Sequence, residues 1–123
     1  MDSGWVESER QRAVALLAPE RTGVLMQTVA LNPLPEAVGA LTGIGWSTDA
    51  PEVRVNVYLF GDWDQAGRVG AILTEMVDGG VYYARAATNG GLLFFAAARI
   101  DHPHPHETRA RVDRLMSAFS GLE

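Results

Sequence analysis

The feature that most constrains the fold is a pair of apolar segments joined by Asn89-Gly90. Residues 81–88 and 91–100 are rich in aromatic and aliphatic residues, as strands with two covered faces are. An Asn-Gly pair between two such segments predicts a tight hairpin, because both central residues of a type I′ turn need a positive φ. We therefore predict an antiparallel hairpin in which Thr88 pairs with Gly91.

Both faces of the predicted hairpin are apolar. Alternation along the strands puts Tyr83 and Phe94 on one face, and Tyr82 and Phe95 on the other. A sheet with one face in water needs only one apolar face. We therefore expect the second face to be covered by the N-terminal helix, by a second copy of the chain, or by a ligand or partner protein.

The remaining patterns place this hairpin in a single α+β domain of residues 1–123, a common size for one domain. Alternating apolar residues predict a strand, and apolar residues that repeat every three to four positions predict a helix. The predicted elements are helices at 5–18, at 63–78 and after Asp101, and strands at 22–31 and 53–60. The predicted fold is an antiparallel sheet of about four strands on which an N-terminal, a central and a C-terminal helix pack, as in ferredoxin-like folds or small α/β sandwiches.

Residues 32–52 form the one long stretch with neither pattern. Prolines and glycines are frequent in it, and a short helix is predicted over 35–41, with Pro35 in its first turn. Long irregular loops are uncommon in compact domains and are often functional. We therefore predict a binding loop around Trp46, against the plain alternative of a surface connection.

The composition excludes several kinds of chemistry. The chain has no Cys, and all ten of its basic residues are Arg. Disulfides, thiolate nucleophiles, Cys-based metal centres, Schiff-base lysines and the lysine of a phosphate-binding loop are therefore excluded. The sequence carries no recognisable catalytic motif, so we expect a protein without enzymatic activity and without a cofactor.

Charge and hydropathy limit the classes of partner and the cellular locations that we expect. A net charge of −5 argues against nucleic acid, whose binding depends on clustered basic residues. No apolar run is long enough for a transmembrane segment, and the first residues lack the pattern of a signal peptide. A soluble protein is expected, cytoplasmic by default, with export after removal of a signal left open. The Lys-free composition favours a GC-rich, bacterial source.

All the histidines lie in one short segment, as His102, His104 and His106. Imidazole is a common metal ligand, and alternate residues of an extended segment share a face, so these three are a candidate site for zinc, nickel or copper. The prolines between them favour a polyproline conformation, in which alternate residues diverge. The other interpretation is an exposed connection whose prolines begin the last helix.

A second candidate site consists of aromatic and arginine side chains on the predicted strands. Core packing is the ordinary explanation for the aromatic residues. The functional one is a groove for an apolar ligand or a peptide, with arginines that bind carboxylates. The candidate surface comprises Trp46, Arg54, Tyr58, Tyr82, Phe95 and Arg99, with Arg85 as a further anchor.

Together these patterns predict a non-enzymatic binding or protein-interaction module that self-associates, as a homodimer, through an apolar sheet face. One alternative is a metal-binding accessory protein that uses the cluster from His102 to His106. Another is a small-ligand-binding protein or an enzyme with a pocket near Trp46. Dimerisation, stoichiometric metal and an enclosed polar cavity are the observations that distinguish the three.

Overall fold

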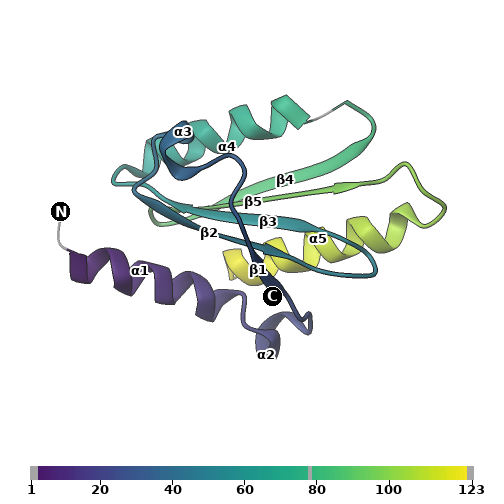
Figure 1. The fold of residues 1–123 in the computed structure, drawn as a ribbon, viewed down its shortest axis with the longest axis horizontal. Coiled ribbons are helices and arrows are strands. Elements are labelled where there is room, and N and C mark those ends of the chain that lie inside the picture. The colour runs from purple at the N-terminus through teal and green to yellow at the C-terminus, as the bar shows by residue number, and fades with distance from the viewer. Residues whose placement is uncertain (1–2, 78, 122–123) are drawn as a thin grey trace.

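A five-stranded antiparallel sheet lies between two layers of helices in the computed structural model, which describes residues 3–77 and 79–121 (Figure 1). The sheet order is β1-β2-β3-β5-β4. Helices α1 and α5 lie on one side of the sheet, and α3 and α4 on the other. The helices are α1 (Ser3–Leu16), α2 (Pro19–Thr22), α3 (Pro35–Val38), α4 (Trp63–Val77) and α5 (Pro105–Ser120). The strands are β1 (Gln27–Val29), β2 (Thr42–Ser47), β3 (Arg54–Leu59), β4 (Tyr82–Asn89) and β5 (Leu92–Arg99).

The predicted fold class is confirmed, with one strand more than the four or so expected. The additional strand is β2, in the stretch for which we predicted an irregular loop. Its glycines, which suggested a loop, allow close packing instead: a Cβ atom at Gly45 would lie 2.8 Å from the carbonyl oxygen of Val29 on β1. The prediction that Trp46 belongs to a loop is therefore wrong, because Trp46 lies on β2 and pairs with Thr28 on β1 and Val55 on β3.

The predicted strand at 22–31 is the least accurate of the predicted elements. Thr22 ends the short helix α2, and only Gln27–Val29 pair with β2. Thr22 is fully buried, and its hydroxyl bonds the backbone on both sides, accepting from Val24 N–H and donating to the carbonyl of Ala18 or Val24. A β-branched residue that we assigned to a strand therefore stabilises a turn through its side chain.

The hairpin is present, but its turn lies one residue further along the chain than predicted. Asn89 pairs with Leu92, so that Gly90 and Gly91 form the turn. Gly90 has a φ of +64° and Gly91 has no positive φ, as in a type II′ turn. This shift moves the register by two residues, so Arg85 faces Ala96 and not Phe94. Because side chains alternate with a period of two, each residue still lies on its predicted face.

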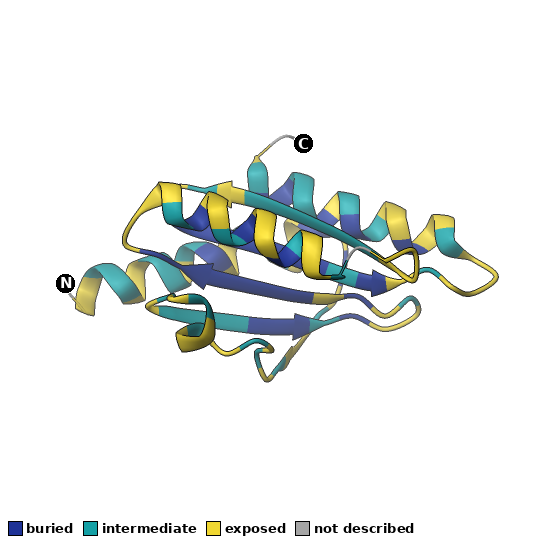
Figure 2. Cartoon of the chain, turned by 90° about the horizontal axis from the view of Figure 1, so that it is seen from above, coloured by how far each residue is buried: buried dark blue, intermediate teal, exposed yellow. Residues whose placement is uncertain are grey.

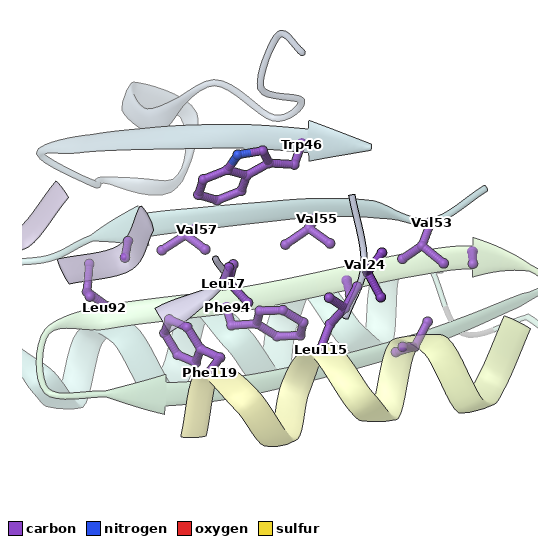
Figure 3. Close-up of a cluster of buried hydrophobic side chains, with 14 of the residues drawn as sticks. Leu17, Val24, Trp46, Val53, Val55, Val57, Leu92, Phe94, Leu115 and Phe119 are labelled. Carbon is purple, nitrogen blue, oxygen red and sulfur yellow. The ribbon is translucent and has the colours of Figure 1, made fainter. Parts of the chain in front are cut away.

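Two apolar cores lie on the two sides of the sheet. The first, between the sheet, α1 and α5, contains Trp46 and a tilted ring pair of Phe94 and Phe119 with centroids 5.4 Å apart (Figure 3). The second lies under α4 and contains Tyr58, Leu73 and Phe95 among others. The second apolar face is thus covered by α4 of the same chain, a cover that our sequence interpretation did not consider.

Asp62 caps the start of α4. Asp62 Oδ1 accepts a hydrogen bond of 2.8 Å from the backbone N–H of Asp64. Gln65 does not complete a capping box, because its side-chain amide donates to the carbonyl of Gly39 instead and joins α4 to the end of α3. Within the part of the chain that the structure describes, no helix has both the length and the apolar content needed to cross a bilayer.

Candidate functional site

Half of the predicted ligand surface is buried in the two cores. Trp46 is 8% exposed on the side of α1 and α5, whereas Tyr58 and Phe95 lie beneath α4. These three aromatic residues therefore do not form one surface, and core packing explains each of them. The exposed members of the predicted set are Arg54, Tyr82 and Arg99.

Tyr58 has a structural role that depends on its hydroxyl group. The hydroxyl donates to the carbonyl oxygen of Pro33 at 2.6 Å and accepts from the side-chain amide of Asn56, which also donates to the carbonyl of Asn32. The two side chains thereby hold the segment before α3 against the sheet. Burial raises the pKa of Tyr58 to about 12, and the hydrogen bond from Asn56 only partly offsets that effect.

The exposed members of the set meet at one end of the sheet. Arg54 pairs with Ala97, and Arg99 pairs with Tyr82, so the two arginines lie diagonally on the face that α4 covers. They line a hollow of about 370 Å³ together with Tyr82 and His102. That volume lies in the lower part of the range for small-molecule sites, roughly 300–1,000 Å³.

The charges around this hollow are close to balanced. Asp101 accepts two hydrogen bonds from Arg99, at 3.0 and 2.5 Å, and these bonds hold the pKa of the Asp101 carboxyl below its ordinary value. Arg54 donates to the carbonyl of Ala30. Glu52 adds a negative charge at the rim. The hollow can accept a polar ligand, but a bound carboxylate would compete with Asp101 for Arg99.

The histidines do not converge. The Nδ1 atom of His102 accepts a hydrogen bond from the backbone N–H of His104, and its Nε2 atom lies 3.0 Å from the buried hydroxyl of Thr108. Both ring nitrogens are thus engaged within the protein. Among residues 3–77 and 79–121, no three His, Asp or Glu side chains are grouped as metal ligands are. The metal site stays a prediction that this arrangement does not favour.

The other candidate site is the open edge of β4. Ile100 N–H donates to the carbonyl of Val81, so Val81 and Ile100 are a hydrogen-bonded pair of the β4–β5 ladder. Since such pairs alternate in an antiparallel ladder, the odd-numbered residues of β4 bond to β5. The even-numbered residues turn their N–H and C=O groups away from the sheet, and no strand of the described chain pairs with them. These residues are Tyr82, Ala84, Ala86 and Thr88.

A groove of about 560 Å³ runs beside this edge, between β4 and α4. Most of its lining residues are small ones from these two elements. In Figure 2, β4 forms the outer margin of the sheet and is mostly half-buried, and much of the outer surface of α4 is exposed. The small lining residues include Gly67, Gly70, Ala71, Thr74, Ala84 and Ala86.

A polar cluster borders the same edge on the side of α5. Asp113 accepts hydrogen bonds from the hydroxyl of Tyr83 at 2.7 Å and from Arg85 at 3.2 Å. The guanidinium of Arg109 stands 5.6 Å from the centre of the Tyr83 ring. Arg85, which we predicted as a ligand anchor, is thus held by an acidic neighbour on the opposite side of the sheet from Arg54 and Arg99. The α5 side of the β4 edge is therefore charged, whereas mainly small residues line the α4 side.

Sequence reasoning identified β4 but not its place at the edge of the sheet. The order of strands depends on contacts between distant segments, which hydropathy alternation does not report. A usable signal in the sequence is the run of small residues in β4, because small residues permit close approach by another element. That element is α4, since a Cβ atom at Gly70 would lie 3.3 Å from Cβ of Ala86.

Comparison with known proteins adds no functional information. No protein-family model matches this chain, and no significant match was found among curated proteins or among solved structures.

Proposed function

We propose that this protein is a non-enzymatic interaction module that binds a polypeptide strand along the open edge of β4. The observation that carries the proposal is the outward-facing row of backbone groups from Tyr82 to Thr88 beside a groove of small residues. A strand added there would form main-chain hydrogen bonds, and its alternate side chains would enter the groove. The self-association predicted from the sequence would then use this edge and not a sheet face.

The character of β4 supports this function. Natural edge strands that avoid pairing are usually short, or carry Lys, Pro or a bulge. β4 has eight residues in unbroken register with β5 and has none of those protective features. Its one charged side chain, Arg85, donates to Asp113 on α5, and the acidic charge at the groove comes from Glu75 of α4.

The test is a proline that removes one outward-facing N–H group. Ala86→Pro eliminates a donor that has no partner in β5, so the fold should remain intact. Ala87→Pro is the matched control, because the N–H of Ala87 belongs to the β4–β5 ladder and its loss should destabilise the fold.

Association should be measured in two ways with each variant: light scattering of the protein alone, and binding to a phage-displayed panel of random linear peptides. We expect the wild type to self-associate or to select peptides, and folded Ala86→Pro to do neither. The proposal is contradicted if the wild type does neither, or if Ala86→Pro associates as well as the wild type.

A second candidate function is the binding of a small ligand in the hollow at the end of the sheet. It is favoured by the gathering of Arg54, Tyr82 and Arg99 at its lining. A screen of small carboxylates for a rise in melting temperature, repeated with Arg54→Ala, would test it. A ligand that stabilises the wild type and not the variant supports this site.

A further inference from the structure

We propose that the strand that pairs with β4 is β4 of a second copy of the chain, with Ala86 on the two-fold axis between the copies. This inference rests on the proposed function and names its partner. Two-fold dimers are the commonest symmetric assemblies, and an antiparallel strand pair has the required symmetry. The position of α4, the register of β4 and the charges on α4 each support it.

The position of α4 suits a second α4 on the other side of the axis. A Cβ atom at Gly70 would contact both Ala86 on β4 and Leu93 on β5, so α4 lies over these two strands. Strands lie about 4.8 Å apart, so extending the sheet by a second β4 would bring the two α4 axes to roughly 10 Å from each other. Helices pack at about 8–10 Å, the shorter distances requiring small residues at the contact. The side of α4 next to the edge provides Gly67, Ala71 and Thr74.

The register follows from the backbone and from Arg85. For several residues of the two β4 strands to pair, the two-fold axis must pass through Ala84, Arg85 or Ala86. An axis at Arg85 would place two Arg85 side chains directly opposite each other, and like charges in that position are destabilising. An axis at Ala84 would extend the pairing past the start of β4 toward Gly80, whose φ is +84°. An axis at Ala86 pairs residues 83–89 within the strand, and places Arg85 opposite Ala87.

The charges of α4 complement each other in this arrangement. Arg68 and Glu75 are both exposed, and neither has an ion-pair partner in the part of the chain that the structure describes. The two copies of α4 would run antiparallel and cross near Ala71, which lies close to the midpoint between Arg68 and Glu75. Arg68 of each copy would then face Glu75 of the other, giving two ion pairs at the rim of the helix contact.

Cysteine cross-linking can determine the register between the two β4 strands, because the chain has no native Cys. The variants are Arg85→Cys and Ala87→Cys, which in the proposed register form a non-hydrogen-bonded pair with Cα atoms about 4.5 Å apart. That separation permits a disulfide. Each variant alone would put its two thiols on a diagonal, with Cα atoms roughly 8 Å apart. We expect mild oxidation of the mixture to give mainly the mixed disulfide, distinguished by a tag on one chain.

A pair of neighbouring substitutions on α4 tests the helix contact. Ala71 lies on the groove side of the helix, and Ile72, which is 54% exposed, does not line the groove. Ala71→Glu should convert a dimer of about twice 13.3 kDa into a monomer, and Ile72→Glu should leave the dimer unchanged. Both positions are exposed in the single chain, so both variants should fold.

The outcomes separate this inference from the function on which it rests. Cross-linking of Arg85→Cys with itself, or dimers insensitive to Ala71→Glu, would overturn the proposed arrangement while leaving β4 as a binding edge. A wild-type monomer that binds linear peptides through β4 would overturn the second copy as partner and retain strand binding. A monomer that binds no peptide would overturn both.

Discussion

The guanidinium of Arg12 holds Asn89 by two hydrogen bonds, one of 2.7 Å to its side-chain oxygen and one of 2.8 Å to its backbone carbonyl. The side-chain amide of Asn89 donates in turn to the carbonyl of Phe119 at 2.9 Å. One asparagine at the end of β4 therefore connects α1, the hairpin and the last turn of α5.

We expect this connection to be measurable as a coupling energy. Arg12→Ala and Asn89→Ala should each lower the free energy of unfolding by about 1–3 kcal/mol, because half-buried partners lose charge-assisted hydrogen bonds. The double variant should lose about 1 kcal/mol less than the sum of the single ones. Urea denaturation of the four proteins gives the cycle, and strict additivity would show that the contact contributes nothing.

Two glycines of α4 should respond oppositely to alanine. A Cβ atom at Gly67 would meet no atom within 4 Å, so Gly67→Ala should raise the free energy of unfolding by roughly 0.5–1 kcal/mol through the helix propensity of alanine. At Gly70 the same atom would lie 2.9 Å from Cδ1 of the fully buried Leu93. Overpacking should make Gly70→Ala destabilising by about 1–3 kcal/mol. Thermal unfolding at low protein concentration measures both, and equal shifts would contradict the packing described under α4.

Tyr58 predicts a loss of stability at alkaline pH. Its pKa is about 12 in the folded chain and 10.0 ordinarily, so folding favours the protonated hydroxyl. The resulting stabilisation is complete below pH 10 and is lost as the pH rises toward 12. At pH 11 the free energy of unfolding should have fallen by about 1 kcal/mol. Urea denaturation between pH 9 and 11.5 should show this decline, and Tyr58→Phe should lack that part of it. The ultraviolet titration of tyrosinate offers a second check, with a component at high pH that Tyr58→Phe lacks.

Asp101 should titrate at unusually low pH as long as Arg99 is present. The hydrogen bonds from Arg99 stabilise the carboxylate, so the pKa of Asp101 is lowered. Carbon-13 NMR of the side-chain carboxyl group should show its midpoint move up toward the ordinary value in Arg99→Ala, whereas Arg54→Ala should leave it nearly unchanged. An unchanged midpoint in Arg99→Ala would mean that the ion pair is not formed in solution.

The sequence was sufficient for the elements whose patterns are local. The alternation of β3, the periodicity of α4 and the presence of the hairpin of β4 and β5 all depend on neighbours within one turn or one strand pair. The missed elements depend on distant contacts. Gly43 and Gly45 signal a loop in isolation, and they belong to a strand because distant segments lie against them. Leu31 and β3 lie against Gly43, and β1 lies against Gly45.

The candidate site divides in the same way. Sequence alone determined that Arg54, Tyr82 and Arg99 belong to strands of one sheet and that the chain has no thiol or lysine chemistry. Only the tertiary structure decided that Trp46, Tyr58 and Phe95 are core residues and that β4 lies at the edge. The physical reason is that alternation shows which residues share a face, whereas strand order and helix placement decide which face is covered and which backbone groups remain unpaired.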